Sequence, residues 1–491
     1  MRIPIFGSFT DRNTNPTAFQ SGDQQFTNCY PVVATNELAK TNHVFLVKRP
    51  GATVSANVAG SGYVSQPSSV VWTGGSGNPI VYGFASSAAN KIQYWVLSTL
   101  TQVGGDISTT GTPAAYSLSE TSISGVANLV SLSLDGSTQE AWFYPSGGAW
   151  TQITDSDYPS NAGYTVVGSP AHMDGYMFVM DSQGGISNSD VNSLSSWTAG
   201  NRLVANTMPD MGVGLARIKN VIAGFGRYSI EFFQNAGNSS GSILSPIGNA
   251  CHRIGAIDLN STNKRTIMTV EDTVYFMGRD AETQRVGFYK LNGFEPQKLS
   301  SNFVDELLQT ASAITGVLLL HGMQHIVTDM AYNSGYLCYC IDTSFWWILN
   351  ITQAPLVASI QNSMSVSSVG NERNLYTFHT GTGAVVYQDA GQSYSAVAQI
   401  GPIDNGSNNV KRWNRIDLVG DKQSTSGNTT IEYFDDDGTS PTTWGTVDMS
   451  APPCRLRRGG SSARRFLRIT DSVNRPWRVE YLDIETADKV R

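Results

Sequence analysis

The sequence predicts an all-β protein built around a β-propeller of six or seven blades, and three observations lead to this prediction. Charged residues make up only 14% of the 491-residue chain, against roughly 25% in an average globular protein. Glycine is abundant, at 48 residues. Short apolar runs of two-residue period recur, each ending in a Gly, Asp or Asn turn, as is typical of strands joined by hairpins.

Seven of these runs fall between about residues 78 and 387, at intervals of about 35 to 60 residues. Propeller blades contain four strands and repeat every 40–50 residues or so, so the spacing favours a propeller. A large array of β-sandwiches is the alternative that the pattern leaves open. The runs are IVYGFA (80–85), AWFYPSGGAW (141–150), YMFVMDSQGG (176–185), VIAGFGRYSIEFF (221–233), VYFMGRD (274–280), YLCYCIDTSFWWIL (336–349) and LYTFHTGTGAVVY (375–387).

These features divide the chain into an extended N-terminal arm or connector (1–60), a propeller (61–394) and a C-terminal all-β domain (395–491). Within the arm, NCYPVVATNELAKTNHVFLVKRPG (28–51) fits no regular element well. The segment SSNFVDELLQTAS (300–312) predicts one short amphipathic helix packed on the propeller rim. After the propeller, Ser- and Asn-rich spacers separate strands such as RWNRIDLV and TTIEYF, which predicts a small β-sandwich.

Charge is distributed unevenly. The net charge of −7 and the pI near 5.4 argue against a protein that holds nucleic acid nonspecifically through its overall field. Eight arginines between Arg455 and Arg478 nevertheless face a single acid, Asp471. In CRLRR and RRFLRI they alternate with apolar residues, so strands would place the arginines on one face. That face is either simply solvated or contacts an acidic neighbouring subunit or the DNA backbone.

No residue pattern supports a metal, cofactor or catalytic site. Cys338 and Cys340 would share one strand face, but a zinc site needs a second pair, so buried thiols are the better interpretation. In HGMQH, His321 and His325 would share a helical face, but Gly322 stands where a zinc protease has glutamate. The five cysteines are scattered, which suits a reduced compartment. Without a signal peptide or an apolar span, we expect a soluble protein made inside the cell.

Two stretches resemble degenerate Asp-boxes, the turns that staple the blade hairpins of sialidases. They are SNSDVNSLSSW (187–197) and DDDGTSPTTW (435–444). In such turns side chains bond backbone amides while a tryptophan packs beneath, so a structural role is expected. A calcium loop is the alternative for the second stretch, but it lacks the bidentate Glu near loop position 12.

Three segments together resemble the phage stabilisation protein family, the packaged-DNA stabilisation or tail-hub (nozzle) proteins of short-tailed phages. The first is NCYP followed by LVKRPG. The second is MPDMGVGLARIKNVIAGFGRYSIEFFQNAG followed by GNACHRIGAI, and the third is the closing RRFLRITDSVNRPWRVEYLDIE. The last departs from the family pattern through its Ser/Gly-rich spacer, GGSSARR.

The resemblance implies a virion protein of the phage tail, assembled in the host cytoplasm. It would form a homo-oligomeric ring, expected to be a hexamer, below the portal and its adaptor protein. The ring would extend the DNA channel, help retain packaged DNA and help eject it. Its implied partners are the adaptor, the tail fibre, tailspike or needle proteins, and genomic DNA, which it would contact transiently. The resemblance implies no membrane anchor.

In this interpretation residues 28 to 51 form a connector in which Lys48 and Arg49 contact a neighbouring acidic surface. The candidate interaction residues are Lys48, Arg49, Arg455, Arg457, Arg458, Arg464, Arg465 and Arg468. Two other functions stay open at this point. One is a receptor- or glycan-binding propeller, which Trp142, Trp150, Trp346 and Trp347 would permit, and the other is a remote sialidase-like hydrolase.

Overall fold

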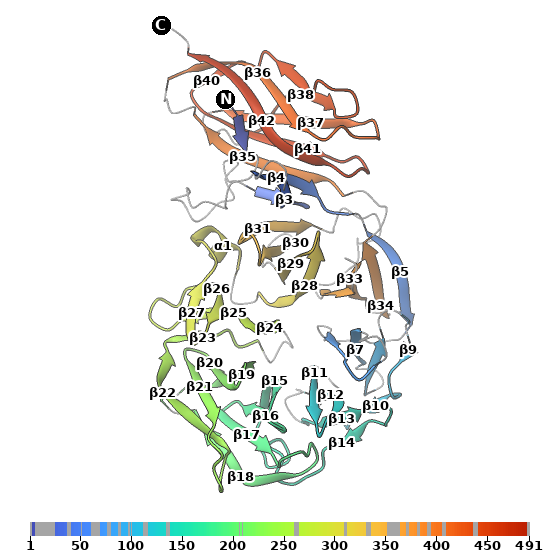
Figure 1. Cartoon of the computed structure of the whole chain (residues 1–491), viewed down its shortest axis with the longest axis vertical. Helices are drawn as coiled ribbons and strands as arrows, with labels where there is room; N and C mark the ends of the chain where they lie inside the picture. Colours follow the sequence, from blue (N-terminus) through green and yellow to red (C-terminus); the bar gives the residue numbers. More distant parts are fainter. Residues whose placement is uncertain are drawn as a thin grey trace.

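The computed structural model describes residues 2–4, 25–36, 41–50, 52–59, 69–75, 80–86, 90–96, 99, 101–110, 116–133, 138–205, 207–208, 210–259, 265–308, 312–329, 335–350, 364–369, 373–380, 383–389, 394–404, 409–435 and 440–488. Strands dominate these residues. In Figure 1 a ring of sheets occupies the lower part of the molecule, and a second unit, which carries both ends of the chain, lies above it.

The ring consists of groups of strands that pair mainly with their neighbours in sequence (Figure 1). Five groups form sheets of their own, and each innermost strand faces the centre of the ring. Their strands are β6 (Ser69–Val71), β7 (Ile80–Ser86), β8 (Lys91–Val96), β9 (Thr101–Gln102) and β10 (Ile107–Ser108); β11 (Tyr116–Ile123), β12 (Val126–Ser133), β13 (Ala141–Pro145) and β14 (Thr151–Gln152); β15 (Val166–Met173), β16 (Tyr176–Asp181), β17 (Gly185–Ser189) and β18 (Trp197–Val204); β19 (Gly212–Ile218), β20 (Val221–Gly226), β21 (Ile230–Asn235) and β22 (Leu244–His252); and β23 (Ile254–Ala256), β24 (Ile267–Val270), β25 (Thr273–Asp280), β26 (Val286–Asn292) and β27 (Glu295–Lys298).

Two further groups complete the ring among the described residues, which makes seven groups in all. One contains β28 (Ile314–Leu320), β29 (Met323–Asp329), β30 (Gly335–Cys340) and β31 (Phe345–Asn350). The other contains β32 (Met364–Val369), β33 (Arg373–Thr380) and β34 (Gly383–Asp389), and its fourth strand is β5 (Ala52–Ala59) from the start of the chain. Because β5 pairs antiparallel with β34, strands from two distant parts of the sequence close the ring. This topology confirms the propeller prediction.

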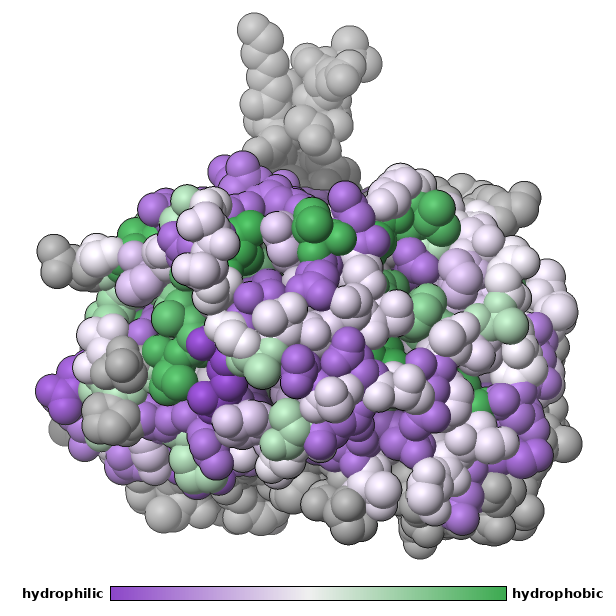
Figure 2. Space-filling model, turned by 90° about the horizontal axis from the view of Figure 1, so that it is seen from below, coloured by the Kyte–Doolittle hydropathy of each residue, from purple (hydrophilic) through white to green (hydrophobic). Residues whose placement is uncertain are grey.

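The hydrophobic cores of the ring lie between neighbouring groups. One core joins Val130 and Ile153 of the second group to Val179 and Trp197 of the third, and similar cores join the following pairs. Burying each large apolar side chain contributes about 1.5–3 kcal/mol, so each blade is stabilised chiefly by its neighbours. The exposed large hydrophobic residues are scattered singly over several elements. The rim seen in Figure 2 is accordingly mixed, with small separate hydrophobic patches.

A repeated hairpin turn links the innermost strand to the next strand in five consecutive groups. Each turn has two central residues, and the first is left-handed in every case: Ser124 (φ 50°), Asp174 (53°), Lys219 (53°), Glu271 (52°) and His321 (50°). Glycine follows in three of them and also has a positive φ, as in type I′ turns, whose twist matches that of the paired strands. These turns bring residues about 45–50 positions apart in sequence to one mouth of the ring.

The upper unit is a sandwich of two sheets, in agreement with the sandwich architecture predicted for the C-terminal part of the chain. One sheet has the order β3-β4-β42-β36-β39, and the other continues from β31 through β2 and β35 to β41, β37 and β38. The strands are β1 (Arg2–Pro4), β2 (Gln25–Thr27), β3 (Cys29–Asn36), β4 (Thr41–Lys48), β35 (Ala396–Ile403), β36 (Lys411–Gly420), β37 (Asn428–Asp435), β38 (Thr442–Asp448), β39 (Arg455–Arg457), β40 (Ser461–Ser462), β41 (Arg465–Asp471) and β42 (Arg478–Asp488).

The N-terminal residues belong to this sandwich, which the sequence analysis did not predict. The prediction that residues 28 to 51 form no regular element is wrong, because β3 and β4 form an antiparallel hairpin in register from Cys29↔Lys48 to Asn36↔Thr41. β4 pairs with β42, and β2 lies between β35 and β31. One hydrophobic core therefore runs from Trp347 in the ring to Trp413 and Trp477 in the sandwich, so the two units pack together as one body.

Two local predictions are confirmed. The segment LCYCIDTSFWWIL folds as the hairpin β30–β31, with Cys340 opposite Phe345. The expected helix is α1 (Asn302–Leu307), which is shorter than the predicted segment and begins at Ser301, whose hydroxyl accepts from the Val304 amide. Val304, Leu307 and Leu308 are buried, and α1 lies against β26 on the ring's outer side.

Candidate interaction sites

Lys48 is buried at the junction between the N-terminal hairpin and the sandwich. Its Nζ donates to the main-chain oxygens of Asp471 (3.1 Å) and Val473 (2.8 Å) and lies 3.3 Å from Asp471 Oδ1. Burial lowers the pKa of Lys48, and the Asp471 carboxylate opposes that shift. Because the ammonium is enclosed by its own chain, Lys48 pairs with Asp471 inside the molecule and does not make the expected contact with a neighbouring acidic surface.

Asp471 is the centre of a fully buried ion cluster. The guanidinium of Arg475 donates to its carboxylate through Nε (3.1 Å) and through Nη2, and Thr429 Oγ1 donates at 2.8 Å. Arg475 also donates to the carbonyls of Thr425 and Gly427. A buried charge persists only when it is paired and hydrogen-bonded, and the two cations around one carboxylate satisfy that condition.

Arg49 is also buried, so it cannot form the outward contact that the sequence analysis predicted. Its Nε donates to the carbonyl of Pro50 at 3.0 Å, and its guanidinium carbon lies 4.3 Å from the ring centroid of Tyr394. This packing desolvates the cation over an aromatic face. Residues 48 and 49 therefore act inside the chain.

The arginines of the C-terminal domain do not share one face. Arg455 binds Asp417 through two bonds of 2.7 and 2.8 Å. Arg465 is buried, binds Asp435 through two bonds of 2.7 and 3.0 Å, and stacks 3.8 Å above the Tyr433 ring. In β41, residues 465 and 468 are an odd number of positions apart, so they point to opposite faces.

The paired arginines leave a small exposed group, which we call the arginine patch: Arg412, Arg457 and Arg458. All three are exposed. None of them forms an ion pair or side-chain hydrogen bond among the described residues, whereas Arg468 pairs with Glu432 and Arg478 with Asp421. Strand pairing brings the patch together, because Arg412 lies opposite Ser461 and Arg415 opposite Arg457. Arg464 is exposed beside the patch.

Sequence reasoning missed Arg412, although a signal for it was present. Arg412 precedes Trp413 in KRWNRID, a cation-rich stretch at the start of β36. The sandwich core buries Trp413 and Ile416, and the alternation of a strand then turns Arg412 outward. The strand pairing that joins it to Arg457 could not be read from local pattern.

Cys338, Cys340 and His325 are packed inside the ring, whereas His321 lies in the exposed turn between β28 and β29. Cys338 and Cys340 are buried, and burial raises the pKa of both thiols. His325 is also buried, and the Trp347 indole donates to its Nδ1 at 3.1 Å. Burial lowers its pKa to about 3, so the ring is neutral. The Tyr30 hydroxyl hydrogen-bonds His321 Nδ1 at 2.7 Å. Among the described residues, no three His, Cys, Asp or Glu side chains are placed to hold a metal ion.

The first Asp-box-like stretch is a stapled turn. Asp190 accepts from the hydroxyls of Ser196 (2.6 Å) and Thr198 (2.9 Å), and Trp197 is buried beneath with its indole donating to the Leu194 carbonyl. The turn thus fixes the crossing from β17 to β18, as predicted. The second stretch, DDDGTSPTTW, includes residues 436–439, which lie outside the described residues.

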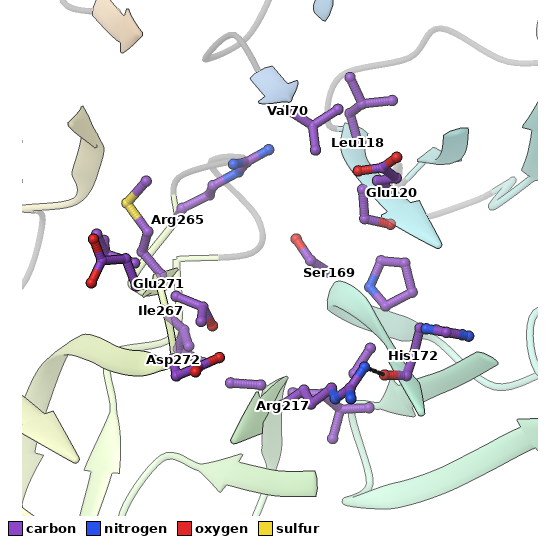
Figure 3. A pocket seen from close by; sticks show the side chains of 18 of the residues that line it. Val70, Leu118, Glu120, Ser169, His172, Arg217, Arg265, Ile267, Glu271 and Asp272 are labelled. Carbon is purple, nitrogen blue, oxygen red and sulfur yellow. Dashed lines mark hydrogen bonds between the residues drawn. The ribbon is translucent and has the colours of Figure 1, made fainter. Parts of the chain in front are cut away.

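A cavity of about 780 Å³ occupies the centre of the ring (Figure 3). Its walls come from the innermost strands of successive groups and carry charges of both signs: Glu120, Arg217, Lys219, Arg265, Glu271 and Asp272. Arg217 donates to the His172 carbonyl at 3.2 Å, and Glu120 accepts from the Thr73 amide at 2.7 Å. The volume lies within the range of about 300–1,000 Å³ typical of small-molecule sites.

The aromatic residues suggested for glycan binding are mostly engaged elsewhere. Trp346 and Trp347 are buried. The Trp150 indole donates to the Val103 carbonyl at 3.0 Å, and its ring packs on Tyr94. A glycan platform needs an open aromatic face, and these three side chains do not present one. Trp142 is half-buried.

Comparison with known families adds the deciding observation. The sequence model of the phage stabilisation family, described as "Bacteriophage P22 Gp10, beta-propeller", matches residues 16–319. The chain belongs to this family. The match covers more than half of the chain, from the N-terminal hairpin through β28, and it agrees with the propeller topology. The closing RRFLRITDSVNRPWRVEYLDIE lies beyond it.

Other comparisons are distant. The chain is 12% identical to YCF48 from Cyanidioschyzon merolae (TM-score 0.40, covering 69% of this chain and 98% of that one). It is 11% identical to BamB from Moraxella catarrhalis (TM-score 0.36, covering 69% and 98%), and 9% identical to a chain of a mitotic checkpoint complex (TM-score 0.38, covering 70% and 94%). No curated protein matches the chain. Among the described residues, no helix is long and apolar enough to cross a membrane.

Proposed function

We propose that this phage stabilisation family protein is a structural component of the virion of a short-tailed phage. Several copies, with six expected, form a ring in the tail below the portal and its adaptor protein. The ring extends the DNA channel, helps retain the packaged genome and helps eject it. The observation that carries the proposal is the family match over residues 16–319.

The shape of the chain supports a role as a rigid building block. The propeller and the sandwich share one core through Tyr30, Trp347 and Trp413, and the buried Lys48–Asp471 pair ties the first strands to the last. A shared core resists the relative domain motion that is otherwise the default. A tail segment under the pressure of packaged DNA needs this stiffness.

The central cavity favours a DNA path between copies rather than through one propeller. Its volume of about 780 Å³ suits a small ligand, and its walls carry both signs of charge. A duplex needs a wider passage, which several copies arranged around an axis would enclose. The net charge of −7 also suits a channel that lets DNA pass without trapping it.

The proposed partners follow from this position. One face of the ring would dock on the adaptor, and the other would receive the tail fibre, tailspike or needle proteins. Genomic DNA would touch the channel only in passing. No membrane anchor is proposed, and assembly would take place in the host cytoplasm.

Electron microscopy tests the placement. The purified chain should form closed rings, and with the adaptor present the rings should stack coaxially on it. In particles that carry an affinity tag on this chain, antibody labelling should lie on the tail between the adaptor and the tail tip. Labelling on the capsid surface, or chains that never close into rings, would contradict the proposal.

A further inference from the structure

Arg412 of the arginine patch lies on β36, and Arg457 and Arg458 lie at the end of β39 and at the start of the loop after it, which hydrogen bonds hold against β36. The Arg458 amide donates to the Asn414 carbonyl at 3.0 Å, and the Gly459 amide donates to the Trp413 carbonyl at 2.8 Å. The Trp444 indole donates to the Arg457 carbonyl at 3.2 Å and covers Gly459, where an added Cβ would lie 2.3 Å from its ring. Binding through this loop therefore loses little conformational entropy.

The three exposed arginines of the patch lie close together, and none of them forms an ion pair among the described residues. Arg465 lies beneath this loop, fully buried, with Asp435 as its acidic partner. Its Nη1 has no hydrogen-bond partner among the described residues, and its Nη2 lies 3.9 Å from where a Cβ on Gly460 would be. Four neighbouring arginines each form an ion pair with an aspartate: Arg415, Arg455, Arg475 and Arg478. The patch arginines differ from them in having no such partner.

The overall charge of the chain indicates the kind of partner. The net charge is −7, and removing the three patch arginines leaves −10. Because the rest of the chain is this negative, it repels the phosphates of DNA, which disfavours DNA as the partner. Another copy of the chain, in contrast, offers an acidic body. Two patches that met each other across a two-fold axis would bring like charges together, so the patch must bind a different surface of the other copy. When this pair of surfaces repeats head to tail from copy to copy and the rotation closes, the contact builds a ring.

The propeller carries a matching acidic surface. Glu271 and Asp272 form the exposed turn after β24, and Asp342 lies in the exposed turn after β30. Gln324 joins them, since its side-chain amide donates to Glu271 Oε1 and its main-chain amide to Asp342 Oδ2, both at 3.1 Å. None of the three carboxylates has an ion pair among the described residues. They stand at the mouth of the ring, near the turn after β28, whose His321 hydrogen-bonds Tyr30 of the sandwich.

We propose that the arginine patch of one copy binds the carboxylates of Glu271, Asp272 and Asp342 on the next copy. This inference rests on the proposed ring and names the surfaces that build it. Arginine suits the role, because its planar guanidinium binds carboxylates through two parallel hydrogen bonds. Complementary charges at such a contact determine which partner binds, and in which orientation, more than they determine the affinity.

A charge-swap experiment tests the contact. The first variant carries Arg457→Glu and Arg458→Glu, the second carries Glu271→Arg and Asp272→Arg, and the third combines all four. Self-association is measured by sedimentation velocity and mass photometry at low and high salt, with circular dichroism to verify folding. Each double variant should raise the apparent dissociation constant at least tenfold, and the combined variant should recover most of that loss.

A matched control separates the contact from general charge effects. The double variant Arg285→Glu and Lys422→Glu makes the same charge change at two exposed positions away from the patch, and its self-association should stay within about twofold of the wild type. If the wild type forms rings that neither reversal weakens, or if the combined variant stays as weak as its parents, the contact is wrong while the ring stands. A wild type that remains monomeric at every concentration would overturn both the contact and the ring.

Discussion

The Nζ atom of Lys48 lies 3.3 Å from Oδ1 of Asp471, although 423 residues separate them in the chain. The pair joins the end of the N-terminal hairpin to the last strands of the sandwich. Arg475 approaches the same carboxylate from the other side. The position of β5, which closes the propeller, therefore depends on a buried charge cluster in the neighbouring domain.

The cluster predicts an order of stability losses. Asp471→Asn leaves the buried cations Lys48 and Arg475 facing each other without an anion, so it should lower the free energy of unfolding by about 3–5 kcal/mol. Lys48→Met leaves the Asp471–Arg475 pair intact and should cost less, about 1–3 kcal/mol. Urea denaturation of the two variants measures the order, and equal losses would contradict the prediction that Asp471 holds both cations.

His325 predicts how stability depends on pH. Burial holds its pKa near 3 in the folded chain, against about 6.5 in the unfolded chain. Between these values the unfolded state binds more protons, so the stability present above pH 6.5 is lost as pH falls toward 3, at up to about 1.4 kcal/mol per pH unit. In His325→Asn, whose side-chain oxygen lies where Nδ1 accepts from Trp347, that slope should be shallower by this amount. An unchanged slope in denaturation midpoints would place the titrating group elsewhere.

Gly168 lies where two blades approach each other closely, so we expect a substitution there to be costly. Its φ is +69°, and an added Cβ would lie 2.7 Å from the Gly214 Cα and 2.9 Å from the Val213 carbonyl on β19. Gly168→Ala should therefore force β15 and β19 apart and cost at least about 3 kcal/mol. Gly125→Ala is the matched control, because Gly125 also has a positive φ but nothing lies within 4 Å of its added Cβ, so only about 1–2 kcal/mol of backbone strain is expected. Equal losses, measured by thermal unfolding, would refute the close packing.

The local sequence pattern was sufficient to predict elements formed by residues close together in the chain, such as single hairpins and one helix. Hairpins such as β30–β31 follow from alternating residues around a short turn, and helix α1 follows from its cap and apolar spacing. The five two-residue turns from Ser124-Gly125 to His321-Gly322 were equally local, and their period of about 45–50 residues could have been found in the sequence.

Features that depend on pairing between strands far apart in the sequence could not be predicted from the local pattern. The hairpin β3–β4 contains Pro31 and lacks a Gly-rich turn, and β42, more than 400 positions away, pairs with it. Two of the arginines show the same dependence on long-range pairing, because the acid that neutralises each comes from another strand: Asp417 from β36 for Arg455, and Asp435 from β37 for Arg465. Sequence alone could count the arginines but could not separate the paired ones from the exposed patch.

The affinity of the purified chain for DNA should be low. With a net charge of −7 and three arginines in the patch, we expect weak binding to duplex DNA and a log–log salt slope of small magnitude. Fluorescence anisotropy with a labelled duplex, repeated from low to moderate salt, measures both. Tight binding with a steep slope that disappears in Arg457→Glu, Arg458→Glu would show that the patch holds DNA directly.

Particles that lack the protein test the central claim most directly. A genome packed under pressure acts on whatever closes the portal channel, so a missing tail segment should fail after filling rather than before it. In cells infected with a phage that lacks this gene, DNA synthesis and packaging should proceed normally, and the particles should then lose their DNA, measured as nuclease-sensitive DNA released over time. Particles that never fill, or that fill and keep their DNA as well as the wild type, would contradict the proposed function.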